Sequence, residues 1–255
     1  MFLAPLFVPL LFAAADLPAA IAAGDEAFAR IEYPSAIAAY EHALAEHPDE
    51  PELLWRLARV YVCAGEIAQE NDQRQLFIAA ERCARRCIAL DSLNGPGHTW
   101  LAGALGYIAL SESVGRKVAL SRELLQEALR ALELNPNDDA AYSIIGSFYR
   151  ALGNAGWLQR TIAAVFLGDV PKGGYDEAEA ALKNAVRIAP EIMRHQYELG
   201  VLYLDMGRIE DARAALQAAI ALPIRTAIDR PRFAKARTLL EELPPPQEGR
   251  PRPGE

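Results

Sequence analysis

Small residues recur at one spacing five times along this 255-residue chain, and the repetition constrains the fold more than any other feature. In the first copy the steps are four, three and five residues: Ala36, Tyr40, Ala43 and Pro48. Four further copies keep the same steps: Ala80, Ala84, Cys87, Ser92; Leu124, Ala128, Ala131, Pro136; Ala178, Leu182, Ala185, Pro190; and Ala212, Leu216, Ala219, Ile224. Short side chains at helical spacing let two antiparallel helices approach closely. The pattern therefore predicts a series of stacked helical hairpins.

The repeated unit resembles the tetratricopeptide repeat, a helix–turn–helix of about 34 residues. The resemblance implies an all-α fold, an α-solenoid (right-handed superhelix) of about five repeats with a C-terminal capping helix. We expect the repeat domain to span 16–243. Within it we place repeats near 17–50, 51–94, 96–137, 138–190 and 192–225, and the cap over 229–243.

The turn between the two helices of a repeat, the A–B turn, is longer in the three central repeats. In the first repeat twelve positions separate the small residue of the first helix, Gly24, from that of the second, Ala36. The corresponding separations in the second, third and fourth repeats are 21, 20 and 32. Insertions at one point of the repeat emerge on one edge of a solenoid. The longest insertion, 156–175, has an apolar helical stripe and predicts an additional short helix that covers an apolar surface.

The first fifteen residues carry no charged side chain, and Ala13-Ala14-Ala15 before Asp16 resembles a signal-peptidase site. As a helix the fourteen-residue, mostly apolar run 2–15 would reach only about 21 Å, short of the roughly 30 Å hydrocarbon core, so no spanning helix is expected. We predict a signal peptide over 1–15 and an exported protein, in the bacterial periplasm or extracellular, with a cytoplasmic protein as the alternative. The composition of 244–255 predicts a disordered tail.

Composition and motifs exclude several classes of function. The net charge of −8 argues against nucleic acid as a partner, because phosphate binding needs clustered Lys and Arg. The three cysteines do not form a disulfide framework, and Cys87 stands where other repeats have alanine, as a small core residue. The four histidines lack metal-ligand spacing, and no nucleophile elbow or phosphate loop is present. We therefore expect no catalysis, no metal and no cofactor.

A narrower resemblance rests on motifs in the second, third and fourth repeats. These are Trp55-Arg56-Leu57-Ala58-Arg59, Gly97-His98-Thr99-Trp100, Gly156-Trp157-Leu158-Gln159-Arg160 and Tyr175-Asp176-Glu177-Ala178. Together they resemble the regulator of microtubule dynamics family over roughly 17–243. The resemblance implies association with microtubules, or a repeat domain that binds and moves phospholipid. Because an exported chain rich in Ala and Arg is typical of bacteria, which lack microtubules, we expect the ligand-binding role to carry over.

The tetratricopeptide resemblance also implies which residues line the concave groove, because the first helix of each repeat faces it. The candidates are mostly apolar, with three arginines and one histidine: Phe28, Leu53, Arg56, Val60, His98, Leu101, Leu105, Ile108, Arg150, Arg194, Tyr197, Val201 and Leu204.

Three interpretations of this groove stay open. An apolar ligand such as a phospholipid would bury its acyl chain there, with Arg56, Arg150 or Arg194 binding the phosphate. Alternatively, a partner protein would lay a helix or peptide into the groove. In the third, inserted segments or the N-terminal arm fill the groove, arginines pair with neighbouring carboxylates, and His98 packs or caps a helix. We expect non-catalytic binding of an apolar ligand, with a protein–protein interaction scaffold as the alternative.

Overall fold

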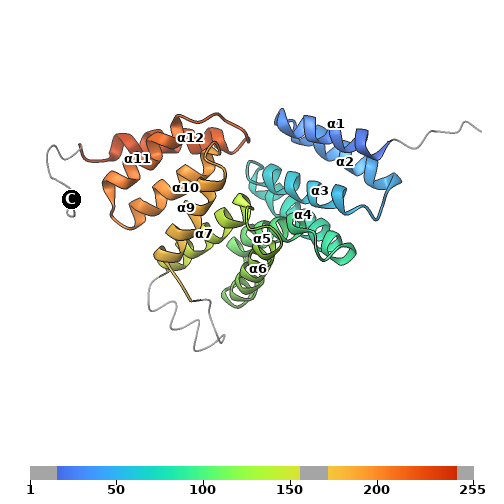
Figure 1. Cartoon of the computed structure of the whole chain (residues 1–255), viewed down its shortest axis with the longest axis horizontal. Helices are drawn as coiled ribbons and strands as arrows, with labels where there is room; N and C mark the ends of the chain where they lie inside the picture. Colours follow the sequence, from blue (N-terminus) through green and yellow to red (C-terminus); the bar gives the residue numbers. More distant parts are fainter. Residues whose placement is uncertain (1–15, 156–171, 246–255) are drawn as a thin grey trace, which may run out of the picture.

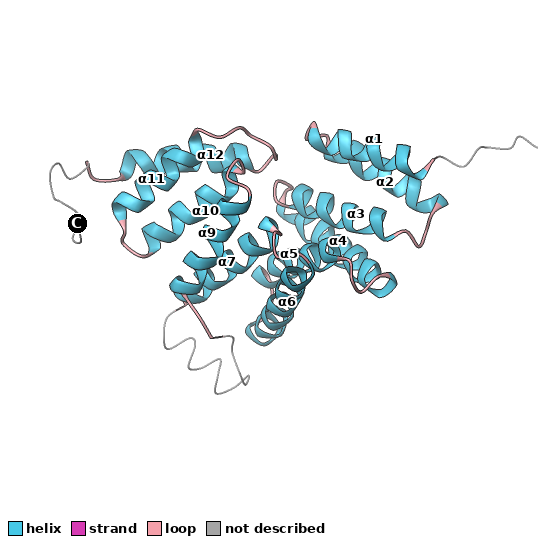
Figure 2. Cartoon of the chain, in the orientation of Figure 1, coloured by secondary structure: helices cyan, strands magenta, loops and turns pink. Residues whose placement is uncertain are grey.

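The computed structural model describes residues 16–155 and 172–245, which form helices and short turns without a β-strand (Figure 2). Figure 1 shows antiparallel hairpins stacked along a curved path. The helices are α1 (Leu17–Ala29), α2 (Tyr33–Glu46), α3 (Pro51–Gly65), α4 (Glu70–Leu90), α5 (Gly95–Leu110), α6 (Val114–Leu134), α7 (Asp139–Asn154), α9 (Tyr175–Ile188), α10 (Met193–Asp205), α11 (Ile209–Ile220) and α12 (Asp229–Glu242). The predicted α-solenoid is confirmed.

Five helix pairs make the repeats: α1 with α2, α3 with α4, α5 with α6, α7 with α9, and α10 with α11. The helix α12 packs on α11 at the end of the stack. Polar side chains cap the N-termini of α5 and α7. Asn94 Oδ1 accepts a hydrogen bond from the amide of Gly97 at 2.9 Å, and Asp138 Oδ1 accepts one from the amide of Ala141 at 2.9 Å. Such caps satisfy amides that have no partner within the helix.

The repeated small residues lie where the two helices of a hairpin touch. Ala36, Ala43, Ala80 and Ala84 have no exposed surface, and their counterparts in later repeats are at most 5% exposed. In the first, fourth and fifth repeats a larger side chain of the second helix packs against a glycine of the first: Tyr40 against Gly24, Leu182 against Gly146 and Leu216 against Gly200. The spacing is thus a packing requirement between helices.

Replacing Gly24 with alanine is expected to destabilise the protein by about 1–3 kcal/mol, the usual cost of overpacking. A Cβ at this position would lie 2.2 Å from Cε1 of Tyr40, whose ring is fully buried and cannot move aside. Because the clash with Tyr40 is severe, we expect the overpacking cost to outweigh the helix-propensity gain of alanine over glycine, about 1 kcal/mol. Thermal unfolding followed by circular dichroism measures the change. Gly103→Ala is the matched control, because its Cβ would meet Ile144 at an ordinary 3.5 Å, and it should keep or raise the Tm.

The insertions of the second and third repeats lengthen helices. In the uninserted repeats α2 and α11 begin three residues before their first small residue, Ala36 or Ala212. The second helices of the inserted repeats, α4 and α6, each have 21 residues, against 14 in α2 and 12 in α11. Both gain about two turns at the N-terminal end, so the inserted residues become two helical extensions on one edge of the solenoid.

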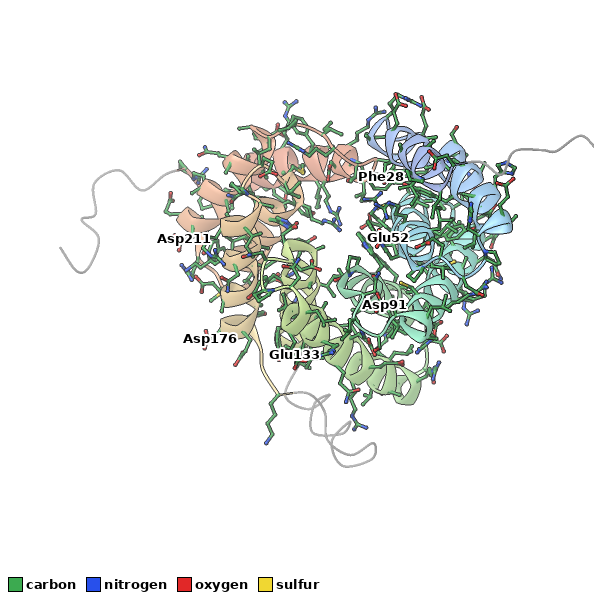
Figure 3. The ribbon with its side chains drawn as sticks, turned by 45° about the vertical axis from the view of Figure 1, so that its right-hand side comes forward. Phe28, Glu52, Asp91, Glu133, Asp176 and Asp211 are labelled. Carbon is green, nitrogen blue, oxygen red and sulfur yellow. The ribbon has the colours of Figure 1, made fainter. Side chains whose placement is uncertain are left out.

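The solenoid curves far enough for its two ends to meet. In Figure 3 the ribbon forms a ring in which the C-terminal helices come round to α1, near the labelled Phe28. The amide of Ala227, in the loop before α12, donates a hydrogen bond to the Tyr33 hydroxyl at 3.0 Å. Ala227 also packs against the hydrophobic core of the N-terminal half. The C-terminal segment therefore contacts the first repeat as well as its own neighbour.

Three expectations fall on residues outside the described ranges: the signal peptide over 1–15, the additional helix of the longest insertion within 156–171, and the tail from 246 onward. Within 16–155 and 172–245 no helix combines the length and the apolar character needed to cross a bilayer.

The thiols of Cys63, Cys83 and Cys87 are free and buried. Burial raises the pKa of Cys63 and Cys87 to about 12 and that of Cys83 to about 11. Only the thiolate reacts with thiol reagents. We therefore expect no labelling of the folded protein at pH 8 and labelling of three thiols in guanidinium chloride, as counted by mass spectrometry. Labelling of any one of them in the folded protein would contradict the buried placement.

Candidate functional site

A groove of about 610 Å³ lies between α5, α6 and α7 and is the main candidate for a functional site. Its size falls within the range of ligand sites, about 300–1,000 Å³. Its wall is mostly apolar. The principal side chains are Trp100, Tyr107 and Leu110 of α5, Val114, Lys117, Val118, Ser121 and Leu124 of α6, and Ser143, Ile144, Ser147, Phe148, Ala151 and Leu152 of α7.

The rim of the groove carries exposed apolar side chains. Leu110 is 72% exposed and Val114 is 65% exposed, among the highest values for large apolar residues in the described part of the chain. Neighbouring exposed apolar side chains at the edge of a concave surface are typical of interaction sites. The exposed apolar rim thus indicates a groove whose apolar side chains become buried when a ligand or partner binds.

The extension of α6 forms one wall of the groove. Val114, Lys117 and Val118 belong to the two added turns, and Ser121 stands where a second helix without an insertion would begin. Without these turns the groove would lose most of its α6 side. The insertion in the third repeat therefore builds the site.

A network of charged side chains closes the inner end of the groove. We call it the closure network and define it as Glu66, Tyr107, Arg194, Glu198 and Arg232. Glu66 is only 2% exposed at its side chain; it accepts a hydrogen bond from Tyr107 and lies 3.3 Å from an Arg232 nitrogen and 4.0 Å from one of Arg194. Arg232 also lies 3.9 Å from Glu198.

The closure network joins the second repeat to the fifth repeat and the C-terminal cap. Glu66 follows α3, whereas Arg194 belongs to α10 and Arg232 to α12. Burial would lower the pKa of Arg194, but the negative charge of Glu66 raises it. Burial raises the pKa of the Tyr107 hydroxyl, and the charge of Glu66 raises it further. Both pKa shifts share one cause: the Arg194 guanidinium and the Tyr107 phenol lie close to the one buried carboxylate of Glu66.

A second cavity of about 800 Å³ adjoins the groove on the inner side of the ring. It shares Tyr107, Leu110, Glu198 and Arg232 with the groove. Its remaining lining is more polar, and three of these residues, Glu70, Gln73 and Arg74, belong to the α4 extension. The other remaining residues are Glu66, Phe77, Ile108, Ser111, Tyr197 and Ile228.

Most of the apolar groove candidates lie in the core between helices. Leu53, Val60 and Leu105 have no exposed surface, Leu101 is 2% exposed and Ile108 is 6% exposed. The first helices α3, α5, α7 and α10 each pack against their own second helix and against neighbouring hairpins, and α3 also packs against α5. This packing covers the positions that an open concave face would expose. Val201 is half-buried, Leu204 packs against the C-terminal core, and neither lines the groove or the second cavity.

The candidate arginines have carboxylate partners inside the fold. Arg56 contacts Asp25 at 3.1 Å and Glu52 at 2.5 Å, whereas Arg150 contacts Glu198 and Asp205, each at 2.8 Å. Of the three, only Arg194 lines the groove.

The pairing around Asp25 fixes the first repeat to the second. Burial alone would raise the pKa of Asp25, but hydrogen bonds from Tyr40 and Arg56, together with the charges of Arg56 and Arg59, lower it. Arg59 also lies over the Phe28 ring at 4.0 Å from its centroid. Phe28 and Arg56, which were predicted to line the groove, therefore stabilise the contact between the first two hairpins.

His98 lies at the start of α5 and is 6% exposed. Its Nδ1 is 2.5 Å from Glu127 Oε2, and its Nε2 is 3.1 Å from the carbonyl oxygen of Ser92. The ring therefore joins the turn before α5 to α6 and has no free nitrogen for a ligand. Among the candidates, Ile108 and Tyr197 line the second cavity.

The residues of α6 that line the groove were absent from the candidates, because the tetratricopeptide resemblance places only the first helix of each repeat on the concave face. One signal for a covered α5 was present: Gly95–Leu110 contains no Asp, Glu, Lys or Arg, which is typical of a helix buried on most sides. In the described ranges, no three His, Cys, Asp or Glu side chains are grouped to hold a metal ion.

Comparison with known proteins places the chain near one family. The family model described as "Regulator of microtubule dynamics protein 1-3" matches residues 20–244. The chain is 26% identical over 195 residues to regulator of microtubule dynamics protein 1 of Bos taurus, covering 75% of this chain and 62% of that protein. It is 24% identical over 184 residues to protein 2 of Bos taurus, covering 71% and 45%. The aligned region spans about half the length of these relatives.

Solved structures support the fold. A thermophilic tetratricopeptide protein of Thermus thermophilus is similar with a TM-score of 0.67 and 24% identity, over 88% of this chain and all of that one. The Pseudomonas aeruginosa protein pilF is similar with a TM-score of 0.53 and 17% identity, over 88% and 90%. At these identities the similarity concerns the fold alone.

The relatives overturn the predicted localisation. They are animal regulator of microtubule dynamics proteins, from cattle, mouse, frog and human among others. The prediction of export to a bacterial periplasm or the extracellular space was therefore wrong. It rested on an uncharged apolar run at the N-terminus that lacks the basic residues of a signal peptide and contains Pro5 and Pro9.

Proposed function

Because this chain belongs to the regulator of microtubule dynamics family, we propose that it acts as a protein–protein interaction scaffold that binds a helix or peptide of a partner in the α5–α7 groove. The function is non-catalytic: the groove supplies shape and apolar surface. The observation that carries the proposal is the apolar rim, with Leu110 72% and Val114 65% exposed at the mouth of the groove. Laying an apolar helix face into such a groove is a recurring mode of peptide recognition.

The charges of the groove favour a protein over a phospholipid. A phosphate group needs cations that can donate hydrogen bonds to it. Arg56 and Arg150 already contact two carboxylates each, and Arg194 and Arg232 surround Glu66. A phosphate at the inner end of the groove would approach Glu66 and Glu198 as closely as the arginines. The attraction of the phosphate to the arginines would therefore be offset by its repulsion from the two carboxylates, and would not compensate for the hydration that the phosphate loses.

The names of the relatives describe them as regulators of microtubule dynamics. A protein-binding groove is compatible with a partner from that setting. Since the aligned region covers 62% of one relative and 45% of the other, we propose a protein partner for this chain without specifying which protein it is.

Native mass spectrometry of the protein purified from its own cells tests the choice of ligand. We expect a complex with a protein at fixed stoichiometry, which releases this chain without any added small-molecule mass. Leu110→Asp, which places a charge at the rim, should lose that partner. A chain that carries the mass of a phospholipid, and loses it in the same variant, would instead assign the groove to a lipid.

A further inference from the structure

The two ends of the groove differ in charge. Its lining contains three basic side chains, Lys117, Arg194 and Arg232, and one acidic side chain, Glu198. At the inner end Glu66 and Glu198 balance Arg194 and Arg232 within the closure network. At the outer end Lys117 has no such balance. The positive charge of the groove is therefore concentrated at the start of α6, in a chain whose net charge is −8.

The beginning of α6 adds to this positive charge. Arg116 precedes Lys117, both are exposed, and the first turn of α6 has no acidic residue. The Lys117 ammonium donates a hydrogen bond to the Leu110 carbonyl at 3.4 Å. No carboxylate within 16–155 and 172–245 forms an ion pair with Arg116 or Lys117. The Ser113 side chain makes no capping hydrogen bond, so the positive end of the helix dipole also faces this region.

The walls of the groove set the length of segment that fits. From Ser143 to Ala155 the α7 wall extends about 18 Å at 1.5 Å per residue, which is about three helical turns. From Val114 to Leu124 the α6 wall extends about 15 Å. The lining includes two aromatic side chains, Trp100 of α5 and Phe148 of the α7 wall. A helix of about three turns with one apolar face matches this surface.

We infer, on the basis of the proposed function, that the partner segment is an amphipathic helix of about three turns with acidic side chains at the end that lies beside Arg116 and Lys117. Its apolar face enters the groove between Phe148 of α7 and Val118 of α6. Its carboxylates lie opposite the two cations and the N-terminus of α6. Complementary charge of this kind sets the orientation of the segment and rejects basic competitors.

Three synthetic 14-residue helical peptides test the inference. They share one apolar face and differ only in two residues at one end, which are Glu, Gln or Lys. Fluorescence anisotropy with labelled peptides gives their Kd values at 50 mM and 300 mM NaCl. We expect the Glu peptide to bind about three- to tenfold more tightly than the Gln peptide and the Lys peptide to bind least tightly, since two exposed charge pairs contribute on this scale. The differences should shrink at the higher salt concentration.

Charge-reversal variants locate the effect. Arg116→Glu with Lys117→Glu should reverse the order of the three peptides. Arg230→Glu with Lys235→Glu is the matched control, because it makes the same change in net charge on exposed residues of α12 outside the groove. It should preserve the order.

The possible outcomes distinguish failure of the inference alone from failure of the proposed function. Equal affinities for all three peptides, abolished by Leu110→Asp, would overturn the charge preference and leave the groove as a peptide site. If the peptides do not bind, or if Leu110→Asp leaves their binding unchanged, the proposed function fails together with the inference. Binding of phosphatidylcholine–phosphatidylserine vesicles that is lost in Leu110→Asp, with no peptide bound, would assign the surface to lipid and overturn both.

Discussion

Glu66→Ala should destabilise the protein by about 3–5 kcal/mol, the usual effect of removing one partner from a buried ion pair. The Glu66 side chain is 2% exposed and lies between Arg232 and Arg194. Its removal leaves two largely buried guanidinium groups, and among residues 16–155 and 172–245 only Glu198 then has a carboxylate oxygen within 4.0 Å of either. Without the shared carboxylate they repel each other, and the contact between α12 and the first half of the chain is lost.

Two measurements report the effect of Glu66→Ala. Thermal unfolding should occur at a lower temperature, and the radius of gyration from small-angle scattering should increase as the ring opens. Glu133→Ala is the control, because Glu133 is 65% exposed and pairs with Arg130 on the surface of α6; exposed pairs contribute about 0–1 kcal/mol. Equal Tm values for the two variants, with an unchanged radius of gyration, would show that the closure network does not hold the ring together.

Leu110→Asp should weaken binding of the amphipathic peptide by tenfold or more while leaving the Tm unchanged. Leu110 is 72% exposed in the free protein, so an aspartate there costs the fold little. In the complex the leucine would be buried, which is worth about 1.5–3 kcal/mol, and a factor of ten corresponds to about 1.4 kcal/mol. A buried carboxylate without a partner would add a further cost.

Leu93→Asp is the matched control for Leu110→Asp. Leu93 is 66% exposed in the turn before α5 and does not line the groove. The same substitution at nearly the same exposure should leave the Kd unchanged, as measured by fluorescence anisotropy. Equal losses in both variants would show that the peptide responds to net charge and that Leu110 has no special place in binding.

The architecture could be predicted from the sequence because it depends on local spacing. Gly24 and Tyr40 meet across one hairpin within seventeen residues, and the same contact recurs between Gly146 and Leu182 and between Gly200 and Leu216. Insertion lengths in the A–B turns were likewise visible as deviations from twelve residues. Their conformation was not, because an insertion of eight residues fits a loop as well as two helical turns, and only packing of α6 against α5 selects the helix.

The site depends on contacts between distant residues, which spacing cannot supply. Arg232 meets Glu66 across 166 positions, and Arg150 meets Glu198 across 48. The arginines were visible as candidates, but apart from Glu52, which lies four residues before Arg56 on α3, the carboxylates that neutralise them come from other repeats. The buried placement of Leu101 and Leu105 has the same origin, since neighbouring helices cover the face that the repeat pattern alone leaves open.

Photo-crosslinking from inside the groove tests the central claim most directly. The photoreactive residue p-benzoylphenylalanine is placed at Leu152, which lines the groove on α7, or at Leu93, which does not. After irradiation with the Glu peptide, mass spectrometry should find a one-to-one adduct at position 152 that unlabelled peptide competes away, and little adduct at position 93. Adducts of equal yield at both positions, or none at 152, would contradict a protein-binding groove between α5, α6 and α7.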